Sequence, residues 1–212
     1  MGNNLIILAS AGAALLVILV GGRLLYKLIQ LPCPPGFIFI LESRMMENVA
    51  GPEAIIQRAG IQPNMRVLDA GCGPGRISVP LAAYLSQEGQ LVALDVQEEM
   101  LKRLAQRLEK RGLDQAEMIQ GGLGTGQIGE NQFDRALLIT VLGEIPNQSA
   151  ALAEIYRALV PGGLLSITEV LPDPHYQRLV KVQRLGEEAG FQPELVHKSW
   201  RSYTLNLKKP QY

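Results

Sequence analysis

The pattern of hydrophobic and polar positions divides the chain into an apolar N-terminal segment and a longer region of alternating elements. Beyond residue 50, short β-branched apolar runs alternate with longer segments of helical periodicity, such as 97–111, where Leu101, Leu104 and Leu108 fall on one face. Strands that alternate with helices are typical of a parallel sheet with crossover helices. The sequence therefore predicts an α/β fold: a three-layer sandwich with a mostly parallel sheet of about seven strands.

The individual elements follow from the same pattern. Strands are predicted at 65–69, 91–95, 116–120, 133–140 and 164–170, helices at 52–59, 77–87, 97–111, 149–159 and 177–189, and a closing antiparallel pair at 194–200 and 202–207. The turn Pro161-Gly-Gly163 is expected to close the helix before it. Because such sheets bind ligands at the carboxyl ends of their strands, the loops after those ends are the ones expected to carry chemistry.

The first thirty residues follow a different pattern, because no charged side chain occurs before Arg23. A helix over residues 4–29 is long enough to cross a hydrocarbon core at a rise of about 1.5 Å per residue, so we predict a single transmembrane anchor over 1–30. Arg23 and Lys27 follow the span and no basic residue precedes it, which predicts that the rest of the chain lies in the cytoplasm. A cleaved signal peptide is disfavoured, since no positive charge precedes the apolar run.

Three prolines separate this segment from the folded region. They stand at positions 32, 34 and 35, where they remove backbone donors and end the helix. We therefore predict a linker and a short juxtamembrane helix over residues 31–50.

Composition and charge exclude several classes of protein. The chain is 47% hydrophobic and its 20 Lys and Arg balance 20 Asp and Glu, so it is a folded protein without the basic field that nucleic acid requires. The two cysteines, Cys33 and Cys72, lie in unlike contexts, which predicts no disulfide and a reducing compartment. We predict no metal site.

One glycine-rich segment carries the clearest chemical signal. The run Val67-Leu-Asp-Ala-Gly-Cys-Gly-Pro-Gly75 leaves the first predicted strand and enters a helix. Its three glycines permit positive φ angles and allow backbone N–H groups to approach a ligand beside a helix N-terminus. Asp95 ends the second predicted strand, where a carboxylate can accept hydrogen bonds from both hydroxyls of a ribose.

The spacing D-x-G-x-G-x-G, with its acid at Asp69, resembles motif I of the class I S-adenosylmethionine-dependent methyltransferases. A dinucleotide-binding G-x-G-x-x-G motif would need glycine where this chain has Arg76, so an NAD-dependent reductase is disfavoured. The resemblance spans about residues 50–170. Within the family, the chain resembles the ubiquinone/menaquinone-methyltransferase-like (type 11) branch. The further segments that carry it are Val92–Asp95, Asn131–Thr140 and Leu152–Gly163.

This resemblance implies a Rossmann-like sheet, a methyltransferase domain over residues 51–212 and S-adenosylmethionine as the cofactor. In the family, the glycines after the first strand hold the methionine part of the cofactor and the acid that ends the second strand holds the ribose. Carried over to this chain, the cofactor-binding residues are Asp69, Gly71, Cys72, Gly73, Gly75 and Asp95, with Val96 against the adenine and Thr140 at the end of the fourth strand.

The chain departs from the family pattern after the third predicted strand. Family members often carry an acid there that binds the adenine amine, whereas this chain has Gln120 followed by Gly121 and Gly122. Backbone groups of these glycines, or the Gln120 amide, would have to substitute. Four glycines within residues 121–126 also favour a mobile loop.

The loops after the fourth and fifth predicted strands are expected to meet the methyl acceptor. Glu144 follows the fourth strand, and we predict Glu144 and His175 as the catalytic residues, acting as a base where the acceptor must lose a proton. The competing interpretations are an exposed loop glutamate and a solvated or capping histidine. Asp134 and His197 are expected to be structural, and Cys72 to contribute its backbone rather than a nucleophile. The side chains gathered after the fifth strand are Glu169, Asp173, His175 and Tyr176.

Together these features predict a membrane-anchored S-adenosylmethionine-dependent methyltransferase with a lipid-soluble or small amphiphilic acceptor. Its expected partners are the lipid bilayer and that small lipophilic acceptor. The alternative is a cofactor-binding membrane regulator or assembly factor without turnover. Both predict cofactor binding, so turnover discriminates between them.

Overall fold

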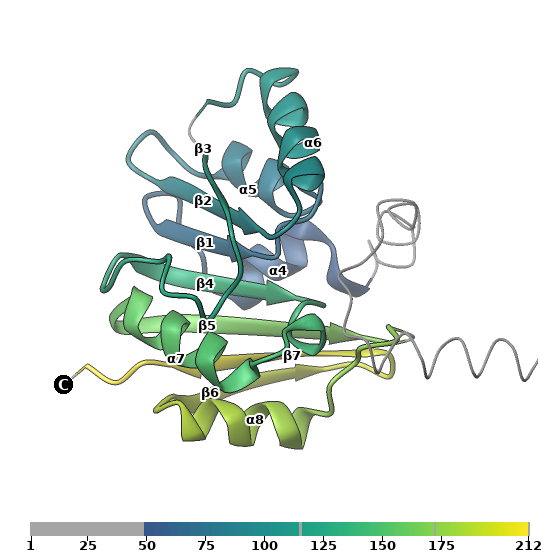
Figure 1. Cartoon of the computed structure of the whole chain (residues 1–212), viewed down its shortest axis with the longest axis vertical. Coiled ribbons are helices and arrows are strands. Elements are labelled where there is room, and N and C mark those ends of the chain that lie inside the picture. The colour runs from purple at the N-terminus through teal and green to yellow at the C-terminus, as the bar shows by residue number, and fades with distance from the viewer. Residues whose placement is uncertain (1–48, 115, 172, 212) are drawn as a thin grey trace, which may run out of the picture.

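The computed structural model describes residues 49–114, 116–171 and 173–211. Seven strands of this part of the chain form one mixed sheet, which runs from β3 at the top of Figure 1 to β6 near the bottom. The prediction of a seven-stranded, mostly parallel sheet with a closing antiparallel pair is therefore confirmed. Their bounds are β1 Arg66–Ala70, β2 Gln90–Asp95, β3 Ala116–Gln120, β4 Phe133–Ile139, β5 Leu159–Val170, β6 Gln192–Lys198 and β7 Ser202–Lys208.

The predicted anchor over 1–30, and all but the last two residues of the predicted linker and juxtamembrane helix over 31–50, lie outside the described residues. Within the described ranges, no helix has both the length and the apolar character needed to cross a membrane.

The strand order places a topological switch point in the middle of the sheet. The order is β3-β2-β1-β4-β5-β7-β6, so the chain winds outward from β1 in one direction and from β4 in the other. Five of these strands are parallel, and β7 is antiparallel to both of its neighbours. The crevice where β1 and β4 separate is the place at which such sheets bind ligands.

Helices cover both faces of the sheet. Because successive side chains of a strand point to opposite faces, each strand packs against helices on both sides. In β1, Val67 packs with the hydrophobic cluster of α4, α5 and α6, whereas Leu68 packs with the cluster of α7 and α8. Leu104 and Leu108 of α6 are buried in the first cluster, in keeping with the predicted apolar face. The helix bounds are α4 Pro52–Arg58, α5 Ser78–Tyr84, α6 Glu98–Glu109, α7 Gln148–Ala158 and α8 Leu179–Glu188, with a 3-10 turn, η2, at Leu142–Glu144.

Two element boundaries differ from the sequence-based prediction by three residues or more. The helix predicted at 77–87 ends at Tyr84, because Leu85 is extended and the next residue, Ser86, donates its N–H to the carbonyl of Pro63 at 2.8 Å. The strand predicted at 164–170 begins instead at Leu159, which pairs with Phe133. The Pro-Gly-Gly turn forms an irregularity inside β5, since the register shifts across it, and does not separate helix from strand.

Candidate active site

The loops after β1 and β2 meet at the carboxyl edge of the sheet. The N–H groups of Gly71 and Cys72 both donate to the carbonyl of Leu94, at 2.7 and 3.1 Å, so the loop continues the pairing of β1 with β2. Gly73 then donates its N–H to Oδ2 of Asp95 at 2.8 Å. The fold thus brings together the glycine motif and the acid at the end of β2.

The three glycines of the motif have different physical roles. Gly71 and Gly75 have φ angles of +74° and +93°, and a β-carbon at Gly71 would overlap Val141, the residue after Thr140. A β-carbon at Gly75 would lie 2.5 Å from Cδ1 of Leu104 in α6. Gly73 has a φ of +54° but no atom within 4 Å of such a carbon, so it faces open space. Two glycines therefore allow tight packing, while Gly73 leaves room for a ligand.

Asp69 joins the two ends of the glycine loop between β1 and α5. It is 2% exposed and accepts a hydrogen bond of 2.5 Å from the hydroxyl of Ser78, the first residue of α5. Burial raises the pKa of Asp69 to about 6, against the lowering effects of Ser78 and the Arg76 guanidinium. Asp69 therefore ties the end of β1 to the start of the next helix, which fixes the path of the glycine loop between them.

Asp95 is the acid that faces the loop. Its Oδ2 accepts from Gly73 and its Oδ1 accepts from the N–H of Gln97, each at 2.8 Å. Burial raises the pKa of Asp95, and these backbone bonds act in the opposite direction. A carboxylate has about four lone-pair sites, so the two backbone bonds leave acceptor capacity for the two hydroxyls of a ribose.

The residue after Asp95 fits the predicted adenine contact. Val96 is 50% exposed although it is apolar, and it lies beside the loop that follows β3, since a β-carbon at Gly122 would be 3.5 Å from Val96 Cγ1. Gly121 donates its N–H to the carbonyl of Asp95 at 3.0 Å. The two glycines predicted to replace the family acid are thus adjacent to the end of β2.

A buried glutamate that the sequence analysis missed holds this glycine-rich loop. Glu154 of α7 is 1% exposed, and its carboxylate accepts from the N–H groups of Gly124, Thr125 and Ile128. Three bonds to a charged acceptor restrain the loop for which the glycine content favoured mobility. The sequence contains a signal for this role, because Glu154 falls on the same helical face as the buried Ala151 and Ala158.

Thr140 directly follows β4 at the switch point, in a strained conformation. Its φ of +59° is uncommon for a β-branched residue. The strain is held by two bonds, from its N–H to the carbonyl of Thr168 at 2.8 Å and from its hydroxyl to the carbonyl of Ile139 at 2.6 Å. Strained residues of this kind cluster at functional sites, and this one turns the chain so that Val141 packs against Gly71.

The loops that carry Glu144 and His175 are in contact. A β-carbon at Gly143, next to Glu144 in η2, would overlap the carbonyl oxygen of His175. The same carbonyl accepts a hydrogen bond of 2.7 Å from Nε2 of Gln177, and the N–H of His175 donates to Oδ1 of Asp173 at 2.7 Å. His175 is 3% exposed, so it is a buried residue at the carboxyl edge and not a solvated one.

Glu169 is a buried titratable group of this rim, and its pKa is strongly raised. It is 1% exposed; its Oε2 accepts from the N–H of Gln177 at 3.1 Å, while its Oε1 has no hydrogen-bond partner among the described residues. Burial, together with the nearby carboxylates of Asp173 and Glu144, raises the pKa of Glu169 to about 8, against the lowering effects of the Gln177 N–H and the Lys181 cation. Glu169 was expected at this rim from the sequence, with no role assigned to it.

The remaining predicted residues occupy structural positions. Cys72 is buried, its thiol donates to the carbonyl of Gly73 at 3.5 Å, and burial raises its thiol pKa, which disfavours the thiolate. Arg76, at the position where a dinucleotide motif needs glycine, donates to the carbonyl of Ala50 at 2.5 Å. Asp134 accepts from the N–H of Arg66 at 2.8 Å and so joins the starts of β4 and β1. His197 lies within β6 and pairs with Thr204 of β7.

The chain matches the family described as "Methyltransferase domain" over residues 61–202, and it belongs to that family. It is 31% identical to a demethylmenaquinone methyltransferase of Geobacillus kaustophilus over 112 residues, which are 53% of this chain and 48% of the relative. It is also 29% identical to a sterol 24-C-methyltransferase of Pneumocystis carinii over 182 residues, which cover 74% of this chain and 47% of the relative. The chain thus spans about half the length of the curated relatives it matches.

The fold has a close counterpart among solved structures. A SAM-dependent methyltransferase from Aquifex aeolicus superposes with a TM-score of 0.76 at 23% sequence identity, over 83% of this chain and 98% of the other. The Rossmann-like fold is therefore confirmed, as are the methyltransferase family, matched over residues 61–202, and S-adenosylmethionine as the cofactor of this family's domain.

Proposed function

We propose that this chain transfers the methyl group of S-adenosylmethionine to a lipid-soluble or small amphiphilic acceptor at a membrane. The observation that carries the proposal is the bond between Gly73 and Asp95 at the switch point, which joins a backbone cradle to a ribose-binding acid. The contact between Gly143 and the carbonyl of His175 supports a shared acceptor site for the two loops at one edge of the sheet.

The chemistry of the acceptor is inferred from two sources. The named relatives act on demethylmenaquinone and on a sterol, both of which are lipid-soluble. The apolar run before Arg23 would hold the chain at the bilayer where such acceptors dissolve, with the domain in the cytoplasm. The names of these relatives and the apolar run both favour an acceptor that reaches the site from the membrane.

The residues of the described domain can perform this transfer with little covalent participation. Gly73 and Asp95 would hold the cofactor, whose sulfonium supplies an activated methyl group when it is bound. The loops of Glu144 and His175 would align the acceptor for in-line attack and exclude water from it. Where the acceptor must lose a proton, Glu169 offers a carboxylate with a pKa of about 8, and His175 lies in the loop that follows it.

The test uses membranes that contain the full-length chain, supplied with cofactor labelled in its methyl group. We expect label in the lipid extract, and at limiting cofactor we expect Asp95→Ala to reduce the label about tenfold or more because the ribose contact is lost. Cofactor binding without label in any fraction would favour the alternative of a regulator without turnover. Label confined to protein or to water-soluble molecules would contradict a lipid-soluble acceptor.

A further inference from the structure

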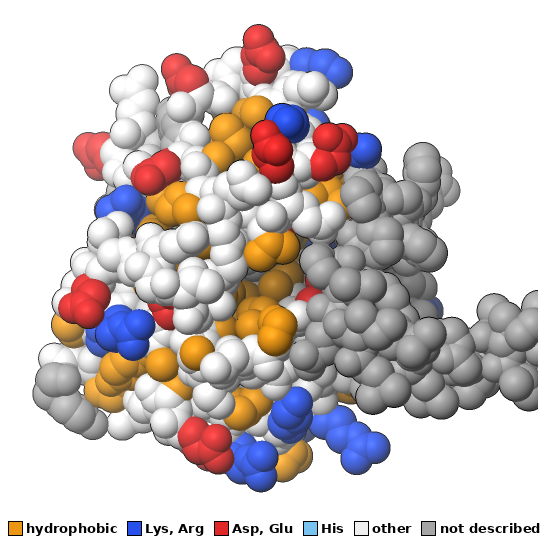
Figure 2. All heavy atoms as spheres, viewed as in Figure 1, with side chains coloured by type: hydrophobic (Ala, Val, Ile, Leu, Met, Phe, Trp, Pro, Cys, Tyr) orange, Lys and Arg blue, Asp and Glu red, His pale blue; other side chains and the backbone are white. Residues whose placement is uncertain are grey.

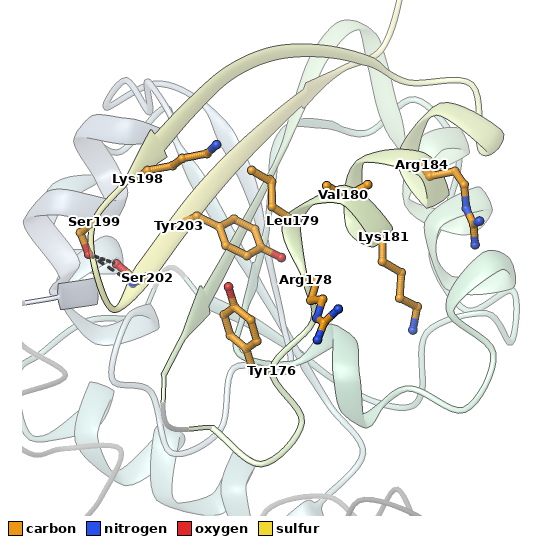
Figure 3. A pocket seen from close by; sticks show the side chains of 10 residues that line it. All are labelled: Tyr176, Arg178, Leu179, Val180, Lys181, Arg184, Lys198, Ser199, Ser202 and Tyr203. Carbon is orange, nitrogen blue, oxygen red and sulfur yellow. Dashed lines mark hydrogen bonds between the residues drawn. The ribbon is translucent and has the colours of Figure 1, made fainter.

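A cavity of about 600 Å³ lies outside the cofactor site, between the start of α8 and the turn that joins β6 to β7. Figure 3 shows the rings of Tyr176 and Tyr203 at its centre, and Lys198 reaching over it from the end of β6. The cavity is lined by Tyr176, Arg178, Leu179, Val180, Lys181, Arg184, Lys198, Ser199, Ser202 and Tyr203.

The charged side chains of this cavity are all cations. Of these, Arg184 forms an ion pair with Glu188 at 3.5 Å. Arg178, Lys181 and Lys198 have no ion pair within the described ranges; the ammonium of Lys181 donates instead to the neutral Gln177 at 2.6 Å. A concave surface with several cations and no carboxylate in its lining raises the local concentration of anions.

Large apolar side chains are exposed beside these cations. Trp200 is 84% exposed, Val180 81% and Leu171 40%. The guanidinium of Arg201 lies 4.9 Å from the centre of the Trp200 ring, and the N–H of Leu171 donates to the carbonyl of Arg201 at 2.7 Å, so Leu171 and Trp200 belong to one surface. Figure 2 shows Lys and Arg beside hydrophobic side chains at the lower edge of the molecule, where α8 lies.

The position of this surface relates it to the acceptor loops. Ser202 pairs with Val170, the last residue of β5, so the β6–β7 turn lies at the edge of the sheet from which the His175 loop departs. Tyr176, the neighbour of His175, lines the cavity itself. A partner that binds here would therefore lie next to the loops proposed to hold the acceptor.

We propose that this surface, made of the cavity residues with Leu171, Trp200 and Arg201, rests on an anionic lipid bilayer. Arg178 and Lys198 take headgroup phosphates at the cavity, while Trp200 and Val180 enter the interfacial region, where aromatic rings and aliphatic side chains are favoured. A second copy of the chain is a poor occupant, because a symmetric dimer would set the same cations against one another. The proposal requires neither the predicted anchor nor methyl transfer.

The chain carries its own reporter for this contact, because Trp200 is its single tryptophan. The full-length chain is mixed with vesicles of phosphatidylcholine, or of equal parts phosphatidylcholine and phosphatidylglycerol, each carrying brominated acyl chains that quench tryptophan on contact. We expect a blue-shifted and quenched Trp200 in the anionic vesicles, weaker quenching in the neutral ones and loss of the difference at high salt. An anchored chain and a free one give the same prediction, since the measured quantity is the depth of Trp200.

Two matched double variants separate this surface from net charge. Each basic residue near an anionic membrane contributes about 1 kcal/mol, or roughly fivefold in affinity, so the double change Arg178→Glu with Lys198→Glu should reduce quenching to the level in neutral vesicles. The same charge change at the exposed Lys110 and Arg111, after α6, should leave quenching unaltered. Should the first variant fail to fold by circular dichroism, the neutralising pair Lys181→Gln with Lys198→Gln replaces it.

Three results would overturn the proposal. The first is no quenching in anionic vesicles. The second is equal loss of quenching in both double variants. The third is a tryptophan shift that needs only inorganic phosphate or a higher protein concentration, which would indicate a soluble anion or a second copy.

Discussion

The cofactor side and the acceptor side of this domain are built from different kinds of contact. On the cofactor side, backbone N–H groups of Gly71 and Gly73 are bonded to the end of β2, and the glycines have the conformations that the loop requires. On the acceptor side, Glu169 near the end of β5 and His175 in the loop after it have buried side chains, and the backbone carbonyl of His175 lies against Gly143 of η2. A site made of backbone depends on a short local motif, whereas a site made of buried side chains depends on elements far apart in the chain.

The largest effect on stability is expected from Glu169, the buried carboxyl group of the acceptor side. Burial raises its pKa from 4.5 to about 8, so the folded state holds a proton that the unfolded state releases, and stability is lost as pH rises from about 5 to about 8. The loss should be roughly 3 to 5 kcal/mol in free energy of unfolding, measured by denaturant titration at a series of pH values. Glu169→Gln should remove most of it.

The Glu169→Gln protein should keep a smaller dependence of the free energy of unfolding on pH. Asp69, whose pKa is raised to about 6, should still lower stability as pH rises up to that value. An unchanged slope between pH 6 and 8 in the Glu169→Gln protein would mean that another group holds the proton.

Gly71→Ala should destabilise the cofactor side by about 2 to 4 kcal/mol, because it combines a positive φ with overlap against Val141. Gly112→Ala is the matched control: it has a φ of +63° and no atom within 4 Å of the added carbon, so it should cost only about 1 kcal/mol. Equal losses for the two variants in thermal or denaturant unfolding would show that packing at the switch point contributes nothing.

A smaller effect is expected at the loop after β3. Glu154→Gln replaces one acceptor oxygen with an amide donor, leaves at least one N–H of the loop unpaired and should cost about 1 to 3 kcal/mol. Hydrogen exchange should accelerate at the amides of Gly124, Thr125 and Ile128. The control Glu130→Gln, at an exposed ion pair with Arg157, should change stability by less than about 0.5 kcal/mol. Unaltered exchange at those three amides would show that Glu154 does not hold the loop.

The same difference explains which features could be predicted from the sequence. The strands β1, β2 and β4 lie within one residue of the prediction because β-branched apolar runs specify buried parallel strands. The conformation of the loop after β1 was predictable because its glycines indicate positive φ angles directly. The start of β5 at Leu159 was not predictable, since the pairing of Leu159 with Phe133 across an irregular turn is a tertiary feature.

The switch point and the acceptor side contain features that a single sequence does not reveal. Thr140 adopts a left-handed conformation for which its residue type gives no signal, because β-branched residues disfavour it. The burial of His175 depends on how its loop, with prolines on both sides in the sequence, packs against η2. Residue type and spacing located both positions, but their environment follows only from the folded chain.

The central claim is that cofactor binding belongs to the glycine loop and Asp95, while the His175 rim serves the acceptor. Titration calorimetry of S-adenosylmethionine with the wild-type chain, Asp95→Ala and His175→Ala tests it directly. Loss of the ribose bonds, worth about 1.5 to 3 kcal/mol each, should weaken binding tenfold or more in Asp95→Ala, whereas His175→Ala should bind as the wild type does. Unchanged affinity in Asp95→Ala, or a comparable loss in His175→Ala, would contradict the division of the site into these two halves.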